Sequence, residues 1–209
     1  MILLALVPAA LLVLDGVTGG FGANPIEEVT HRTGLTALIL LLTTLAVTPV
    51  QRLVRVGALI RLRRTFGLLA FFYASLHLTT YAVDQTYLSG LGVSPAAIAA
   101  DIRERPYITV GFLAFLLLVP LAVTSTRGWI KRLGGKRWQG LHRMVYAAAG
   151  LVVLHFLWLV KADMRPPLIA AGVLAVLLSY RLLHSRWPRR RKREVRVRAP
   201  APAAPHPSA

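Results

Sequence analysis

Three histidines lie inside long apolar stretches of the sequence, where an ionisable side chain is costly. His77 lies within residues 65–83, and His142 and His155 both lie within residues 140–160. Because an ionisable residue inside a membrane is unfavourable, each of these histidines is a candidate for function. The chain contains no cysteine, which excludes thiolate zinc sites and iron–sulfur clusters. Histidine is therefore the main candidate metal ligand.

Depth along the expected helices places two of these histidines at one level. With a rise of about 1.5 Å per residue, His77 lies about 20 Å and His155 about 24 Å from the base-rich edge of the membrane. Two imidazoles at one level can bind a haem iron from both faces, which leaves no axial position for a substrate and is typical of electron transfer. Gly67, Ala70 and Ala74 precede His77 on one helix face and suit a flat macrocycle, although close helix packing explains them equally well. His77 and His155 are predicted as axial haem ligands, with buried hydrogen-bonding histidines as the alternative.

His142 lies at a different level, about 4–5 Å from the same edge and about 20 Å from His155. Two levels of this kind suit the passage of electrons across a bilayer. On one ideal helix, however, the two side chains would point roughly 140° apart. His142 also has no histidine opposite it, since Arg63 and Arg64 occupy that level of the third segment. His142 is predicted as a haem ligand of the second level, with contact to a flavin or to lipid headgroups as the alternative.

The remaining histidines and two aromatic residues have simpler interpretations. His31 lies at the edge of an apolar segment, where histidines are ordinary, and His184 and His206 are expected to be solvated. Tyr81 and Trp158 follow the two predicted axial histidines by four and three residues. They could pack on the haem edge, but they are more simply residues of an aromatic belt at the membrane interface.

The elements that must position these residues are apolar helices. Hydrophobic residues make up 56% of the 209-residue chain, and several stretches approach the roughly 20 apolar residues that a membrane-spanning helix needs. The stretches do not alternate between apolar and polar residues, which disfavours a β-barrel. The fold class is therefore predicted as all-α, a polytopic bundle of six transmembrane helices. Its segments are 2–19, 33–50, 65–83, 107–123, 140–160 and 167–184.

The basic residues alternate between the two sides of this bundle. Nineteen of the 25 lysines and arginines follow the second, fourth and sixth segments, five lie in the other loops, and Arg143 lies within the fifth segment. The positive-inside rule places the base-rich loops and both termini in the cytoplasm of a bacterium, with the chain in the inner membrane. A cleaved signal peptide is the alternative for the first segment, although no basic region precedes it.

Two regions of different composition divide the chain. Residues 1–186 are predicted as the transmembrane haem-binding domain, and residues 187–209 as a basic, Pro- and Ala-rich disordered cytoplasmic tail that touches anionic lipid headgroups. The net charge of +17 would suggest nucleic acid in a soluble protein, but here it follows the membrane topology, so no nucleic-acid partner is expected.

Several motifs together resemble the MsrQ (YedZ) family, over about residues 20–185. MsrQ proteins are the haem-binding membrane subunits of the periplasmic protein-methionine-sulfoxide reductase system, within the ferric-reductase-like transmembrane group. The motifs are Arg61-Leu62-Arg63-Arg64-Thr65-Phe66-Gly67-Leu68, Ala74-Ser75-Leu76-His77-Leu78-Thr79-Thr80-Tyr81, Arg105-Pro106-Tyr107-Ile108-Thr109-Val110-Gly111, Thr124-Ser125-Thr126, Trp138-Gln139-Gly140-Leu141-His142-Arg143 and His155-Phe156-Leu157-Trp158.

The resemblance implies an electron-transfer subunit, not a stand-alone enzyme. It implies electrons from a cytoplasmic NAD(P)H flavin reductase or the quinone pool, passage through b-type haem with FMN as a further cofactor, and delivery to a periplasmic molybdopterin subunit, MsrP, for repair of oxidised proteins. His77, His142 and His155 match the haem-linked histidines of the family. The short N-terminus and the basic tail differ from the family pattern.

Two other functions remain as alternatives. A ferric-reductase-like cytochrome b could act directly on metal ions or oxygen, although the chain contains no recognisable flavin or nicotinamide domain. A haem-free membrane scaffold or transporter is the second alternative. Transporters usually have broken helices near the membrane midplane, whereas the segments here read as continuous apart from Pro8.

Overall fold

The structure is a computed structural model that describes residues 2–89 and 95–185. All secondary structure in these residues is helical, which confirms the predicted all-α class. The tail predicted for residues 187–209 lies outside the described residues. The helices are α1 (Ile2–Thr18), α2 (Pro25–Val54), the 3-10 helix η1 (Gly57–Leu59), α3 (Ile60–Ser89), α4 (Pro95–Glu104), α5 (Pro106–Val123), α6 (Arg127–His142), α7 (Met144–Leu159) and α8 (Arg165–Ser185).

The six predicted apolar segments correspond in order to α1, α2, α3, α5, α7 and α8. Within the described residues, five helical stretches are long and apolar enough to cross a membrane: α2, η1 with α3, α5, α6 with α7, and α8. The N-terminal helix α1 is apolar but shorter than these. The chain is therefore a polytopic membrane protein.

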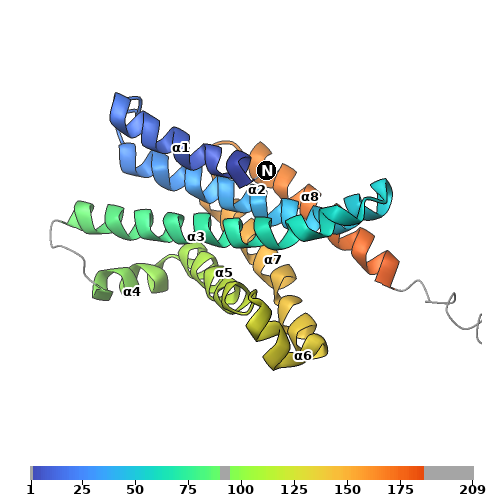
Figure 1. Ribbon diagram of the computed structural model, residues 1–209. Coiled ribbons are helices and arrows are strands. Elements are labelled where there is room, and N and C mark those ends of the chain that lie inside the picture. The colour runs from blue at the N-terminus through green and yellow to red at the C-terminus, as the bar shows by residue number, and fades with distance from the viewer. Residues whose placement is uncertain (1, 90–94, 186–209) are drawn as a thin grey trace, which may run out of the picture.

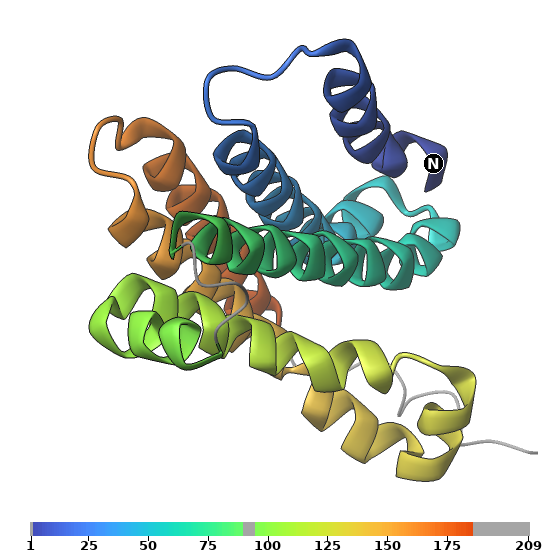
Figure 2. The same cartoon turned by 90° about the vertical axis from the view of Figure 1, so that its left-hand side faces the viewer.

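Two helical hairpins form the centre of the molecule (Figures 1 and 2). Helix α2 packs along α3, and α5 packs along α7, while α8 lies against both α2 and α7. Small side chains permit these close approaches: Ala70 of α3 and Ala148 and Ala149 of α7 are almost completely buried. The small-residue face that precedes His77 therefore packs against other helices, the simpler of its two interpretations.

Helix α2 begins eight residues before its predicted apolar segment because local signals start it early. The Asn24 side chain accepts a hydrogen bond from the backbone N–H of Glu27, Pro25 occupies the first turn, and acidic residues follow it there. These are the features that stabilise a helix N-terminus. The helix ends at Val54, where Arg55 takes a left-handed conformation with φ of 58°. The extension matters because it carries Thr30 to the candidate site.

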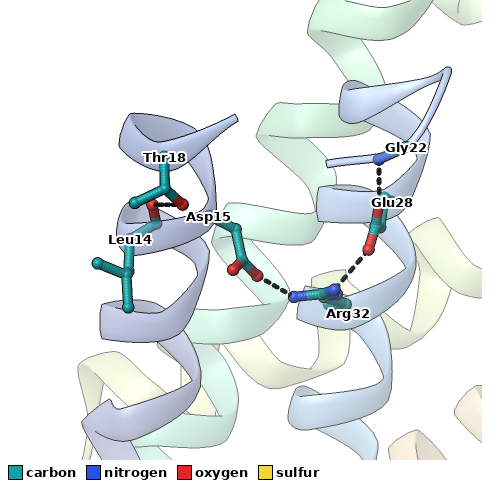
Figure 3. A network of polar contacts seen from close by, with 6 residues as sticks. All are labelled: Leu14, Asp15, Thr18, Gly22, Glu28 and Arg32. Atoms are coloured by element: carbon teal, nitrogen blue, oxygen red, sulfur yellow. Dashed lines mark hydrogen bonds and ion pairs between the residues drawn. The ribbon is translucent and has the colours of Figure 1, made fainter. Parts of the chain in front are cut away.

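The N-terminal helix α1 is connected to α2 by a polar network (Figure 3). Arg32 of α2 forms ion pairs with Asp15 of α1 and with Glu28. The Glu28 carboxylate also accepts a hydrogen bond from the backbone N–H of Gly22 in the connecting loop. Exposed pairs of this kind contribute little to stability on their own, but together they fix the loop between the two helices.

Helices α4 and α6 lie where loops were expected from the sequence. His142 is the last residue of α6. A kink at Gly134, with φ of 72°, interrupts α6, which ends at His142. Helix α7 starts only at Met144. Arg143 between them keeps right-handed helical angles (φ −70°, ψ −21°), and α6 with α7 forms one stretch long enough to span a membrane. The prediction that His142 and His155 share one segment therefore agrees with the structure.

Candidate functional site

The rings of His77 and His155 face each other across the two hairpins. His77 belongs to α3 and His155 to α7, and their ring centroids lie 6.3 Å apart with 74° between the ring planes. Both residues are partly buried. The structure thus brings together the two histidines that helix depth had placed at one level.

A backbone carbonyl of the partner helix fixes each ring. The Nδ1 atom of His77 lies 2.8 Å from the carbonyl oxygen of Thr30 in α2. The Nδ1 atom of His155 lies 2.6 Å from the carbonyl oxygen of Tyr107 in α5. A carbonyl only accepts hydrogen bonds, so Nδ1 must carry the proton and donate it. The neutral ring then keeps its lone pair on Nε2, which is the arrangement of a histidine that binds a metal.

Two glycines make room for these rings. A Cβ atom added at Gly34 would lie 2.9 Å from Nδ1 of His77, and one added at Gly111 would lie 2.7 Å from Nδ1 of His155. Any larger residue at either position would therefore displace a histidine. Gly34 follows Thr30 by four residues, and Gly111 follows Tyr107 by four, so the two hairpins use the same device.

The sequence analysis missed the role of these glycines and of the two carbonyls. The available signal was an isolated glycine in each of two apolar helices, which often marks a close approach. The carbonyls gave no signal, because every residue has one and only the packed structure shows which histidine reaches it.

The separation of the two rings fits a metal ion bound between them. A metal–imidazole bond is about 2.0–2.1 Å long, so two such bonds on opposite sides of one ion separate the two nitrogens by about 4 Å. The distance from each nitrogen to its ring centre accounts for the rest of the observed 6.3 Å. Within the described residues no group of three or more His, Asp or Glu side chains could hold a metal by itself. A pair of axial ligands with the other positions supplied by a macrocycle therefore suits these histidines better than an all-protein metal site.

Aromatic residues lie before and after the His77–His155 pair along the bundle. Phe71 of α3 and Phe115 of α5 stack with ring centroids 5.6 Å apart, where the two hairpins meet. Beyond His77, Tyr81 donates a hydrogen bond to Asp101 of α4, which also pairs with Arg105 at 2.7 Å. Trp158 is about half exposed, in keeping with a belt residue at the membrane interface.

His142 lies apart from this pair and is fixed by its own helix. Its ring stacks on Trp138 with centroids 4.0 Å apart, and its Nδ1 lies 3.2 Å from the Trp138 carbonyl oxygen. Trp138 in turn donates from Nε1 to the carbonyl oxygen of Thr124 at 2.9 Å. Ser125 approaches Nε2 of His142 at 3.5 Å but donates its one hydroxyl hydrogen to Leu121 at 2.7 Å. The His142 ring therefore lies between the Trp138 carbonyl of its own helix and the Leu121–Ser125 end of α5.

His31 lies near the level of the pair, since it follows Thr30 on α2, but its side chain is exposed and it forms no ring contact with His77 or His155 that the structure shows. His184 lies near the end of α8, and His206 lies outside the described residues. Their predicted lack of a ligand role stays a prediction.

Comparisons with known proteins agree with the motifs of the sequence. The family model "Ferric reductase like transmembrane component" matches residues 33–153, more than half of the chain. A relative from Xanthomonas campestris pv. campestris, named "Protein-methionine-sulfoxide reductase heme-binding subunit MsrQ", is 52% identical over 187 residues, which cover 88% of this chain and 81% of the relative.

Two further relatives carry the same name. The one from Ralstonia nicotianae is 50% identical, covering 86% of this chain and 82% of its own length. The one from Xanthomonas euvesicatoria pv. vesicatoria is 47% identical, covering 96% and 91%. No solved structure matches significantly. The chain belongs to the MsrQ family of ferric-reductase-like transmembrane proteins.

Proposed function

We propose that this chain is the haem-binding membrane subunit of a protein-methionine-sulfoxide reductase system, and that His77 and His155 are the axial ligands of a b-type haem. The observation that carries the proposal is the facing pair of imidazoles at 6.3 Å, each fixed through Nδ1 by a carbonyl of another helix. The names of the MsrQ relatives support the cofactor and the reductase system.

The residues of the chain account for the type of chemistry. A bound haem would supply a one-electron redox couple at this site. His77 and His155 would occupy both axial positions, so no substrate could bind there. The Nδ1–H donors fix the tautomer and the orientation of both rings, and they raise the basicity of the ligating nitrogens. The chain therefore suits electron relay between partners.

The partners follow from the family and from the distribution of charge. We infer that electrons enter at the base-rich end from a cytoplasmic NAD(P)H flavin reductase or from quinone, and leave toward a periplasmic molybdopterin-containing MsrP-like subunit. The asymmetry of basic residues supports an inner-membrane location with both termini in the cytoplasm. His142 is proposed as the protein group of the inner level, either as a haem ligand or as a contact for FMN.

Reconstituted electron transfer tests this function. The purified chain in lipid nanodiscs would be combined with an NADH-dependent flavin reductase, an MsrP-like subunit and a methionine-sulfoxide-containing protein. We expect NADH consumption that depends on both the chain and the oxidised methionine, and loss of this activity in His77→Ala. Equal NADH consumption by the His77→Ala variant would contradict the proposed route.

Direct reduction of metal ions or oxygen is the second candidate, because the matched family model describes a ferric-reductase-like component. The same reconstituted chain, without the MsrP-like subunit, would be supplied with ferric citrate or oxygen. Turnover with ferric citrate as fast as with the complete methionine-sulfoxide system would favour this candidate.

A further inference from the structure

A cavity of about 330 Å³ lies at the opposite end of the bundle from the histidine pair, between α2, α3, α7 and α8. Three arginines from three different helices line it: Arg52 of α2, Arg63 of α3 and Arg181 of α8. Along α3, Arg63 precedes His77 by fourteen residues, or about 21 Å. The cavity is therefore separate from the His77–His155 pair and lies at the end of the bundle that also holds His142, whose ring interacts electrostatically with Arg63.

The positive charge of this cavity has no acidic counterpart among the described residues that line it. The ion pairs found within the described residues use Arg32 and Arg105, which lie near the other end of the bundle. Arg52 and Arg181 are exposed and Arg63 is partly buried, so solvent reduces the repulsion among the three guanidinium groups, and an anion bound between them would reduce it further.

Two buried hydroxyl groups in the same cavity also lack a partner. Thr48 Oγ1 and the Tyr146 hydroxyl are inaccessible to solvent and form no hydrogen bond within the described part of the chain. Thr48 is unusual on its helix, since other threonines of α2, such as Thr43 and Thr44, donate to the carbonyl four residues earlier. Burying a hydroxyl without a partner costs about 1–3 kcal/mol, so these two groups point to a ligand.

The ring of Tyr146 also helps to hold the positive charge in place. The guanidinium carbon of Arg181 lies 4.6 Å from the centroid of that ring, which is within the range of a cation–π contact. This contact engages the face of the ring and does not use the Tyr146 hydroxyl.

We propose that this cavity binds a phosphate group, either the diester of a phospholipid headgroup or the monoester of a soluble molecule. Guanidinium groups match phosphate geometry and can bind it through two parallel hydrogen bonds. Three guanidiniums and two hydroxyls offer more donors than the two oxygens of a carboxylate could accept. The cavity volume falls at the lower end of the range for small-molecule sites, so part of the attached group fits as well.

Phosphorus analysis of the purified full-length protein tests the proposal. The protein would be purified in a phosphorus-free detergent and buffer, denatured, and extracted into organic and aqueous phases for ³¹P NMR. We expect about one tightly held phosphorus atom per chain. Phosphorus in the organic phase identifies a phospholipid, and phosphorus in the aqueous phase identifies a soluble phosphate ester. The flavin absorbance of the aqueous phase is measured in parallel, so that phosphorus from FMN is recognised.

Matched variants separate a built site from general attraction by a basic surface. Arg63→Gln and Arg181→Gln should lower retained phosphorus at least about tenfold, since each removes a charge-assisted contact. Arg64→Gln removes the same charge from the same helix at a residue that does not line the cavity, and should retain the wild-type amount. Tyr146→Phe keeps the ring beside Arg181 and should show a smaller loss of phosphorus. This variant keeps the proposal testable if the arginine variants fail to fold.

Two outcomes would overturn the proposal. One is a wild-type protein without bound phosphorus even after phosphatidylglycerol and inorganic phosphate are added back. The other is equal loss of phosphorus in Arg63→Gln and Arg64→Gln, which would indicate nonspecific binding to the basic surface.

Discussion

The two levels of the bundle hold their histidines in different ways. At the outer level, His77 and His155 each donate to a carbonyl of a neighbouring helix, and each faces a glycine of that helix. At the inner level, His142 contacts the carbonyl of Trp138, four residues earlier in its own helix. A ring that is hydrogen-bonded to another helix is held in place relative to the bundle. The position of the His142 ring depends mainly on α6, the helix that carries it. The outer level is therefore pre-organised for a ligand that needs two opposed nitrogens.

The largest expected effect comes from removing an outer histidine. His77→Ala or His155→Ala leaves one axial ligand for a haem that the account assigns two, so each variant should lose most of its bound haem. Pyridine-haemochrome quantification of the purified proteins measures this loss. His31→Ala, which removes an exposed histidine of α2, is the matched control and should keep its haem. Full haem content in both outer variants would remove these residues from the site.

Crowding the outer rings should have the next largest effect. Gly111→Ala would place a methyl group 2.7 Å from Nδ1 of His155, and overpacking of this kind typically costs about 1–3 kcal/mol. We expect reduced haem content and a lower thermal midpoint, with a somewhat milder effect for Gly34→Ala.

Gly150→Ala is the control for these glycine variants. It lies in α7, and an added Cβ there would meet nothing within 4 Å. The substitution should leave haem content unchanged, because alanine also favours the helix more than glycine. Gly111→Ala behaving like Gly150→Ala would show that the close approach does not control the orientation of His155.

Removing the inner histidine should affect electron entry more than the outer site. His142 is distant from the outer pair and takes its contacts from Trp138 and Ser125. We therefore expect His142→Ala to keep the outer haem but to be reduced more slowly by a flavin reductase, measured by stopped-flow absorbance at the haem band. Reduction at the wild-type rate would exclude His142 from the path.

The smallest expected effect concerns the anchor of His142. Trp138→Phe keeps an aromatic ring for stacking but removes the Nε1–H that donates to Thr124. The loss of one hydrogen bond should lower the free energy of unfolding by about 0.5–1.5 kcal/mol, seen as a small drop in thermal midpoint. Outer haem content should not change. Loss of outer haem in Trp138→Phe would show that the two levels are coupled through the bundle.

The sequence was informative wherever a property depends on apolar length or on residue type. It predicted the membrane segments because a span needs a long apolar run, and it placed His77 and His155 together because helix rise converts residue number into depth. It missed α4 and α6, since both are polar enough to resemble loops. It placed His142 and His155 in one segment, which the structure forms from α6 followed directly by α7, but nothing in the sequence marks the one-residue break at Arg143.

The fine structure of the site depends on packing that a single sequence does not show. The carbonyls of Thr30 and Tyr107 reach the histidines because α2 begins at Pro25 and α5 begins at Pro106. Each helix therefore already includes the residue whose carbonyl contacts a histidine. The role of Gly34 and Gly111 likewise appears only when the rings lie against those helices. Residue types were therefore predictable, whereas the groups that orient them were not.

The state of the haem in the wild-type protein shows directly whether His77 and His155 both bind its iron. The full-length protein, expressed with an ample supply of haem and purified, would be examined by a dithionite-reduced minus oxidised spectrum and by electron paramagnetic resonance of the ferric form. We predict a b-type spectrum with a low-spin ferric signal, because two nitrogen ligands, from His77 and His155, would bind the iron. A high-spin signal, or a protein free of haem, would contradict it.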